Sequence, residues 1–160
     1  MKGLVNQIVL WFLCRGMDVL AQEDERVKKE ILRLPEDYKI CLKTGMTKMS
    51  PQISMIVKNG RVLRMKRPDG ADLTIVFKNA HTAFKVFTGQ MSIAAAYAAH
   101  GFYLKGNINT AMGVVRCMEY VELYLFPKIM SKRILKRVEK KQLPALEVYV
   151  KAIFERGGAV

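Results

Sequence analysis

The fold is decided by the stretch Ile53-Ser-Met-Ile-Val-Lys58, Asn59-Gly60, Arg61-Val-Leu-Arg-Met-Lys66. On both sides of the Asn-Gly pair, apolar residues recur at every second position, a period typical of β-strands. Asn and Gly tolerate the positive φ that a tight hairpin turn needs at both central positions. The stretch therefore predicts a β-hairpin with strands over 53–58 and 61–66.

The pattern extends outward from this hairpin. Further strands are predicted over 38–44, 72–77 and 102–108. Helical spacing of apolar residues predicts the helices, which cover 3–20, 23–34, the segment capped by Asn79, 91–99 and 110–125, with two more after Pro127 and Pro144. In the first helix, the apolar stripe expected to face the core consists of Leu4, Ile8, Trp11 or Phe12, and Val19. Because the strands do not alternate regularly with helices, the order indicates an α+β domain.

Charge and cysteine content set the expected environment. The net charge is +13 in 160 residues, a length that suits a single domain. Segment 38–70 holds 8 basic and 1 acidic residues, and segment 126–141 holds 7 and 1, so these two carry the whole excess. Such a field attracts either an acidic membrane surface or a nucleic acid. Cys14, Cys41 and Cys117 are widely spaced without a CxxC pair, which favours a reducing cytoplasm over a disulfide framework or zinc site.

Three local sequences stand out by their order and spacing. They are Ala71-Asp-Leu-Thr-Ile-Val-Phe77 followed by a helix, Phe84-x-x-Phe87-x-Gly89, and Gly101-Phe-Tyr-Leu-Lys-Gly106-Asn107 followed by Ala111-Met112. Together they resemble the sterol carrier protein type 2 family. Asn107 stands where the family more often has Asp. The resemblance covers residues 38–125, so we expect one domain over 1–160. It would have a sterol-carrier-like core at 38–125, an N-terminal helical extension at 1–36 and a basic C-terminal helical extension at 126–160.

The resemblance implies a curved, five-stranded, mainly antiparallel sheet covered by helices, with an apolar tunnel for a lipid between the two layers. Strand alternation and helical spacing then select the residues expected to line it. The predicted lipid-binding residues are Ile53, Met55, Val57, Leu63, Met65, Leu73, Ile75, Phe77, Phe84, Phe87, Met91, Tyr97, Leu104, Met112, Val115 and Met118. Ordinary packed core is the alternative for each of them. Tyr97 or Tyr103 could hold a lipid head group or serve a structural role.

The segment after Pro127 has a basic face and an apolar face. Its basic residues are Lys128, Lys132, Arg133, Lys136, Arg137, Lys140 and Lys141. A basic amphipathic helix can dock on an acidic bilayer, or it can be the solvated outer face of a helix packed on the domain. Both readings are open, and the first predicts a membrane-docking surface.

The sequence shows no pattern of catalytic residues. His81 and His100 are isolated, and no nucleophile elbow, metalloprotease motif, phosphate loop or dinucleotide fingerprint is present. We therefore expect no enzyme activity, no metal and no cofactor, but binding and transfer of a fatty acyl, phospholipid or sterol-like lipid. One alternative is an accessory module with a filled tunnel that serves a partner enzyme or self-association. Another is a nucleic-acid-binding protein, although no known nucleic-acid-binding motif is recognisable.

Overall fold

The computed structural model describes residues 2–67, 70–87, 89–125 and 144–154. Five strands form one sheet in the order β3-β2-β1-β4-β5. They are β1 (Lys39–Lys43), β2 (Gln52–Lys58), β3 (Arg61–Arg64), β4 (Leu73–Phe77) and β5 (Phe102–Lys105). Neighbouring strands pair antiparallel except β1 and β4, which pair parallel. The predicted α+β class and mainly antiparallel sheet are confirmed, with one parallel pair at the sheet centre.

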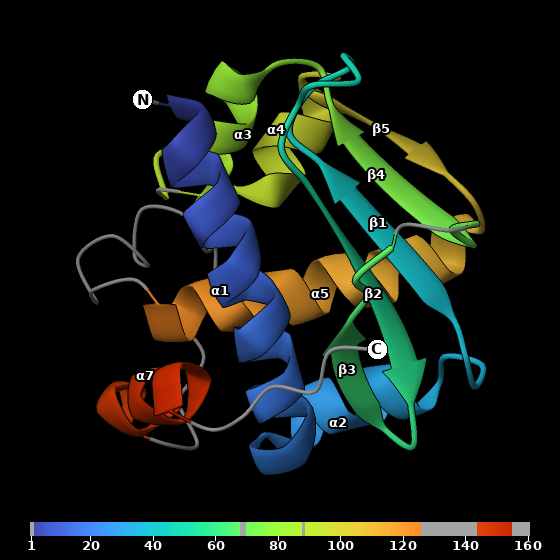
Figure 1. Cartoon of the computed structure of the whole chain (residues 1–160), viewed down its shortest axis with the longest axis vertical. Coiled ribbons are helices and arrows are strands. Elements are labelled where there is room, and N and C mark those ends of the chain that lie inside the picture. Colours follow the sequence, from blue (N-terminus) through green and yellow to red (C-terminus); the bar gives the residue numbers. More distant parts are fainter. Residues whose placement is uncertain (1, 68–69, 88, 126–143, 155–160) are drawn as a thin grey trace.

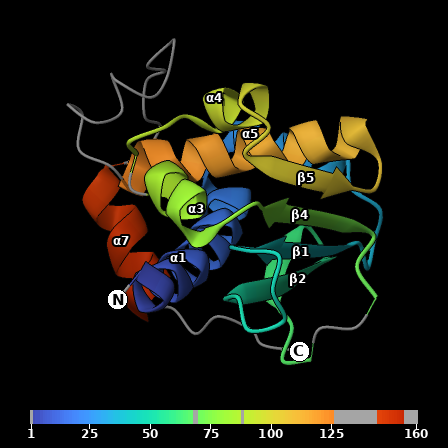
Figure 2. The same cartoon turned by 90° about the horizontal axis from the view of Figure 1, so that it is seen from above.

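The predicted hairpin forms around its Asn-Gly turn. Asn59 has φ 51° and Gly60 has φ 70°, the left-handed values that such a two-residue turn requires. Val57 and Val62 are direct partners on either side of it. Strand β3 ends at Arg64, two residues before the predicted end. The described residues that directly follow β3 lie on the side of the sheet that faces away from α5 (Figures 1 and 2).

The described helices gather on the other side of the sheet or pack against helices that lie there (Figure 2). They are α1 (Lys2–Glu23), α2 (Glu25–Leu32), α3 (Ala80–Phe87), α4 (Ile93–Ala98), α5 (Ile108–Leu125) and α7 (Ala145–Phe154). Polar side chains cap the first turns of α2, α3, α4 and α5. Asn79 Oδ1 accepts the Thr82 N–H at 2.8 Å, and Asn107 Oδ1 accepts the N–H of Asn109 at 2.9 Å. Asn107 thus caps α5, a role for which Asn and Asp are both suited.

The stripe predicted for α1 is wrong at Leu4 and Ile8, whereas Val19 is buried at 1 % exposure as predicted. Leu4 and Ile8 have exposed fractions of 69 % and 49 %, whereas the buried side of the helix carries Leu13, Met17 and Leu20 at 0–1 %. The helix is apolar over most of its surface, so spacing alone does not select the side that packs. By length and composition, residues 3–23 could also cross a membrane, but 61 % of the most apolar window is buried in the domain. In this fold α1 is a core helix.

A buried carboxylate fixes α1 against the edge strand β3. Asp18 is 2 % exposed and accepts hydrogen bonds from Arg61 Nη2 at 2.8 Å, from Arg61 Nε at 3.2 Å and from the Val62 N–H at 3.2 Å. Such charge-assisted bonds to a desolvated carboxylate are strong. These hydrogen bonds hold α1 against β3 at the edge of the sheet.

Candidate functional site

The predicted inner face of the sheet lies against the helices and forms one half of an apolar layer. Six of its residues have exposed fractions of 0–3 %, namely Ile53, Met55, Val57, Leu73, Ile75 and Phe77. Ile40 and Leu42 of the central strand β1 join them at 0 %. All eight belong to a single buried cluster that includes helical residues. This face is therefore apolar across β2, β1 and β4.

The helices provide the other half of the layer, and Leu104 of β5 extends the sheet half beside Ile75. Phe87, Met118 and Val115 are buried at 1 %, 1 % and 8 %. Three more of the predicted residues, Met91, Leu104 and Met112, are partly buried and pack against the same cluster. Phe84 is half-buried.

An aromatic chain links the sheet to α3 and α4. Phe77 lies 5.3 Å from Phe87 and 5.5 Å from Phe102 between ring centroids, and Phe102 lies 5.6 Å from Tyr97. Tyr97 is 47 % exposed, so it sits at the rim of the layer. Tyr103 is 49 % exposed and pairs with Val76 of β4, whose side chain points to the opposite face of the sheet. Tyr97 is thus the better placed of the two tyrosines to meet a polar head group.

The placement of Leu63 and Met65 on the inner face is wrong. Leu63 is the partner of Ile56, and partners in an antiparallel pair share a face. Ile56 alternates with the inward-facing Met55 and Val57, so Leu63 and the following Met65 point away from the helices. The two-residue turn already contained this information, because it makes Val62 the partner of Val57. The inward position in β3 belongs to Val62, which is 2 % exposed.

Glu122 is a buried polar residue that the sequence reasoning missed. It lies four residues after Met118 and seven after Val115, hence on the same side of α5. It is 2 % exposed, and neither carboxyl oxygen has a hydrogen-bond partner among the described residues. Burial, and secondarily the charge of Glu119, raise the pKa of Glu122 well above its ordinary value. Burial on the Met118 side of α5 thus favours the protonated form of this carboxyl group, and its i+4 spacing from Met118 was the available signal.

The layer is closed in this structure. The inward side chains of the sheet are only 0–3 % exposed, so they pack against other side chains of the layer and not against water. Within the described residues, no group of three His, Cys, Asp or Glu side chains could hold a metal ion. The layer therefore presents apolar side chains that are shielded from water. The predicted membrane-docking residues, Lys128 to Lys141, lie outside the described part of the chain.

Comparison with known proteins shows similarity in structure. No protein-family model and no curated protein matches the sequence. A solved structure named "UbiJ-SCP2 Ubiquinone synthesis protein" is 15 % identical with a TM-score of 0.51, over 75 % of this chain and 97 % of that chain. Sterol carrier protein 2 from Yarrowia lipolytica, in its apo form, is 18 % identical with a TM-score of 0.48, over 76 % and 95 %. The resemblance predicted from the three motifs is confirmed in the fold: this chain has the architecture of a sterol carrier protein 2 domain.

Proposed function

We propose that the protein binds the apolar part of a lipid, without catalysis, in the layer between the sheet and the helices. The observation that supports this most directly is the continuity of the layer, in which residues from β1, β2, β4, α3 and α5 form one apolar cluster. The sterol-carrier architecture, whose named examples are sterol carrier proteins, supports the same function. The candidate ligands are fatty acyl chains, phospholipids and sterol-like or isoprenoid lipids.

Binding requires the closed layer to open. Each buried methylene group of a ligand contributes about 0.8 kcal/mol, so a long chain gains enough free energy to displace packed side chains. Met55, Met91, Met112 and Met118 lie in or beside the layer. Methionine is unbranched and flexible, and it can rearrange around ligands of different shape. The same layer can therefore be filled in the free protein and occupied in the bound one.

Glu122 supplies the polar element that the lipid site needs. In its protonated form, which the raised pKa favours, the Glu122 carboxyl group can both donate and accept a hydrogen bond. A polar lipid group that reached it would satisfy two oxygens that lack partners among the described residues. We therefore expect a ligand with an uncharged polar group, such as a hydroxyl or a carbonyl, to bind better than a pure hydrocarbon.

Native mass spectrometry of the purified chain tests the proposal. The protein is measured as isolated and again after incubation with palmitate, cholesterol, phosphatidylcholine and an isoprenoid quinone. The quinone is included because the name of the first structural neighbour refers to ubiquinone synthesis. One retained lipid per chain is the expected result. An unchanged ligand-free mass across the whole set contradicts lipid binding.

A pair of variants locates the bound lipid. Phe87→Ala removes a buried ring whose centroid lies 5.3 Å from that of Phe77. The substitution should alter lipid affinity or chain-length preference. Leu63→Ala removes a similar apolar group from the opposite face of the sheet, and lipid binding should not change. Thermal unfolding of both variants shows whether each remains folded. Equal effects of the two substitutions would place the lipid outside the layer.

The closed layer also supports a second function. A layer filled by its own side chains suits an accessory module that stabilises a partner enzyme or another copy of itself, without a ligand. In that case native spectra show no lipid, whereas co-purification shows a stable protein complex. Exchange of lipid at a membrane belongs to the first proposal and needs the basic segment after Pro127.

A further inference from the structure

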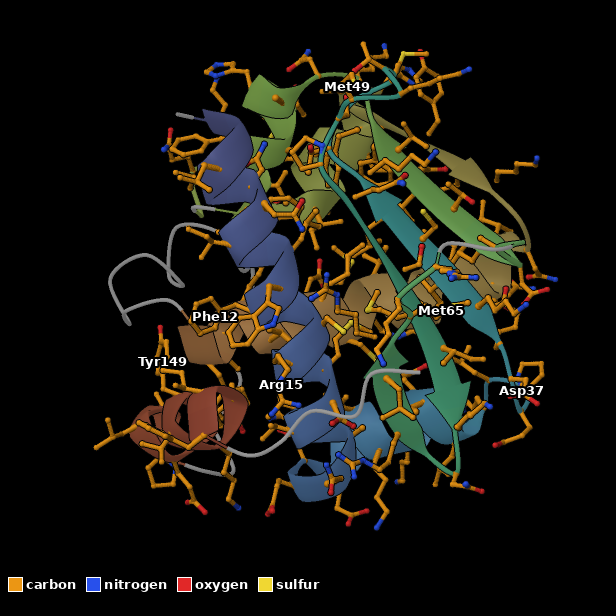
Figure 3. The ribbon with its side chains drawn as sticks, in the orientation of Figure 1. Phe12, Arg15, Asp37, Met49, Met65 and Tyr149 are labelled. Atoms are coloured by element: carbon orange, nitrogen blue, oxygen red, sulfur yellow. The ribbon has the colours of Figure 1, made fainter. Side chains whose placement is uncertain are left out.

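The outer face of the sheet, opposite the apolar layer, carries a separate groove. Figure 3 labels Met65 where the chain after β3 lies beside β2, and Figures 1 and 2 show this segment on the side of the sheet away from α5. A cavity of about 300 Å³ lies between this segment and the sheet. We call it the outer groove; its lining residues include Lys39, Cys41, Lys43, Ser54, Met65 and Thr74. Its size suits a small molecule.

Three short polar side chains form the floor of the outer groove. Cys41 of β1 is the direct partner of Ser54 in β2 and of Thr74 in β4. These side chains therefore stand in one row across three neighbouring strands, about 4.8 Å apart. Cys41 and Ser54 are 5 % and 8 % exposed, which places them at the bottom of the cavity. The row offers two hydroxyl groups and a thiol that can donate hydrogen bonds to one ligand.

Positive charge lies on both sides of this row. Lys39 and Lys43 are two residues before and after Cys41 in the same strand, so their side chains leave the same face of the sheet. Among the described residues, neither lysine forms an ion pair. The carboxylate of Asp72 lies at the Lys39 end, where its Oδ2 accepts the backbone N–H of Lys39 at 2.8 Å. Two ammonium groups thus flank the polar floor, and one carboxylate only partly offsets them.

A second hollow continues the outer groove on its Met65 side. It has a volume of about 410 Å³ and is lined by Ile56, Met65, Lys66 and Arg67. Met65 belongs to both cavities. Ile56 and Met65 give the hollow an apolar side, and Lys66 and Arg67 add two cations that form no ion pair in the described part of the chain. A ligand that spans both cavities would place an anionic end on the polar row and an apolar end against Ile56 and Met65.

We propose that the outer groove binds a phosphate-bearing molecule with an apolar substituent. A phosphate dianion matches two flanking ammonium groups, and its several oxygens can accept hydrogen bonds from Ser54, Cys41 and Thr74. The sheet separates this site from the apolar layer, so the two sites can be occupied independently. This proposal does not depend on lipid binding in the layer.

Titration of the ¹⁵N-labelled full chain with phenyl phosphate tests the site. Saturable shifts of the backbone amide signals of Cys41, Ser54 and Thr74 are expected. The double variant Lys39→Gln/Lys43→Gln should weaken binding by about tenfold or more, equivalent to about 1.4 kcal/mol. Thr74→Val, which keeps the shape but removes the hydroxyl group, should weaken it less. The matched control is Lys28→Gln/Lys29→Gln on α2, which loses the same charge away from the groove and should bind like the original chain.

Two further probes identify where the phosphate comes from. Inorganic phosphate should bind more weakly than phenyl phosphate, because it leaves the hollow at Ile56 and Met65 empty. If phenyl phosphate causes no shifts, vesicles of phosphatidylcholine with phosphatidic acid should still bind. Lys39→Gln/Lys43→Gln should then weaken vesicle binding, whereas Lys28→Gln/Lys29→Gln should not, and the phosphate source is a lipid head group. The proposal is overturned if neither phenyl phosphate nor the phosphatidic acid vesicles bind. It is also overturned if Lys28→Gln/Lys29→Gln weakens binding as much as Lys39→Gln/Lys43→Gln does.

Discussion

Glu122 is the residue whose chemistry departs most from its surroundings. It is buried at 2 % exposure on the side of α5 that carries Val115 and Met118. Deprotonation in this place would leave a negative charge without a hydrogen-bond donor from the described residues, which is costly. The raised pKa of Glu122 follows from this burial, with Glu119 adding to it. Ionisation of this side chain therefore lowers the stability of the folded state above the ordinary pKa.

Replacing Glu122 should make the stability of the protein less dependent on pH. A raised pKa in the folded state leaves stability intact below the ordinary value of 4.5 and lowers it as the pH rises through the folded pKa. Glu122→Gln removes the ionisation, so the variant should exceed the original chain in unfolding free energy by about 1 kcal/mol or more at about pH 8. Near pH 4, about the ordinary pKa, the two should differ little. Urea denaturation at both pH values measures this, and Glu25→Gln on the exposed face of α2 is the control.

At the scale of the elements, strand β5 and helix α5 meet at a position that only glycine can occupy. Gly106 has φ 131°, and a Cβ atom there would lie 2.5 Å from the Asp72 carbonyl oxygen and 3.2 Å from Leu73 Cα. The chain must therefore pass close to the start of β4 before Asn107 caps α5. This contact ends β5 at Lys105, earlier than the predicted strand. It also explains a glycine in one of the motifs that resemble the sterol carrier family.

Gly106→Ala should destabilise the fold. The substitution combines a strained backbone conformation with a clash against the backbone of β4, and a loss of about 2–3 kcal/mol is expected. Gly3→Ala is the matched control, because its Cβ would make only an ordinary contact with Pro51 at 3.9 Å. Thermal unfolding of both variants measures the difference. An unfolding temperature of Gly106→Ala equal to that of the original chain would contradict the close approach.

For the whole molecule, the distribution of charge governs the expected partners. The two basic segments, 38–70 and 126–141, carry the net charge of +13. The first segment places Lys39 and Lys43 at the outer groove, and Lys66 and Arg67 at the hollow that continues it. The second remains the predicted membrane-docking segment. The two segments therefore permit separate tests, one with a small phosphate and one with a membrane surface.

Neutralising the second segment should weaken binding to anionic membranes. Each basic residue near an acidic surface contributes about 1 kcal/mol. The variant with Lys132, Arg133, Lys136 and Arg137 all changed to Gln should therefore lose affinity for phosphatidylserine vesicles by more than about tenfold. Vesicle co-sedimentation at low and high salt measures this, and vesicles of phosphatidylcholine alone are the control. Unchanged binding to the anionic vesicles would remove the segment from the docking surface.

Local sequence patterns were sufficient to predict the order of strands and helices in the described part of the chain, the hairpin turn and the helix cap at Asn79. Alternation, Asn59-Gly60 and the capping residues act within a few residues of one another, so their effects do not depend on the rest of the chain. The inward positions in β2 and β4 followed from the same alternation. The family resemblance then predicted the architecture that the structural comparison confirms.

Only the tertiary structure decided which faces pack together. Because α1 is apolar on nearly all sides, its buried face depends on what surrounds it, and the register of β3 moves Leu63 and Met65 to the outer face. Glu122 is buried by neighbours that its own helix does not determine. The row of Ser54, Cys41 and Thr74 joins three strands that are distant in sequence. A sequence pattern carries local periodicity, whereas burial and a shared site depend on contacts between segments that meet only when the sheet assembles.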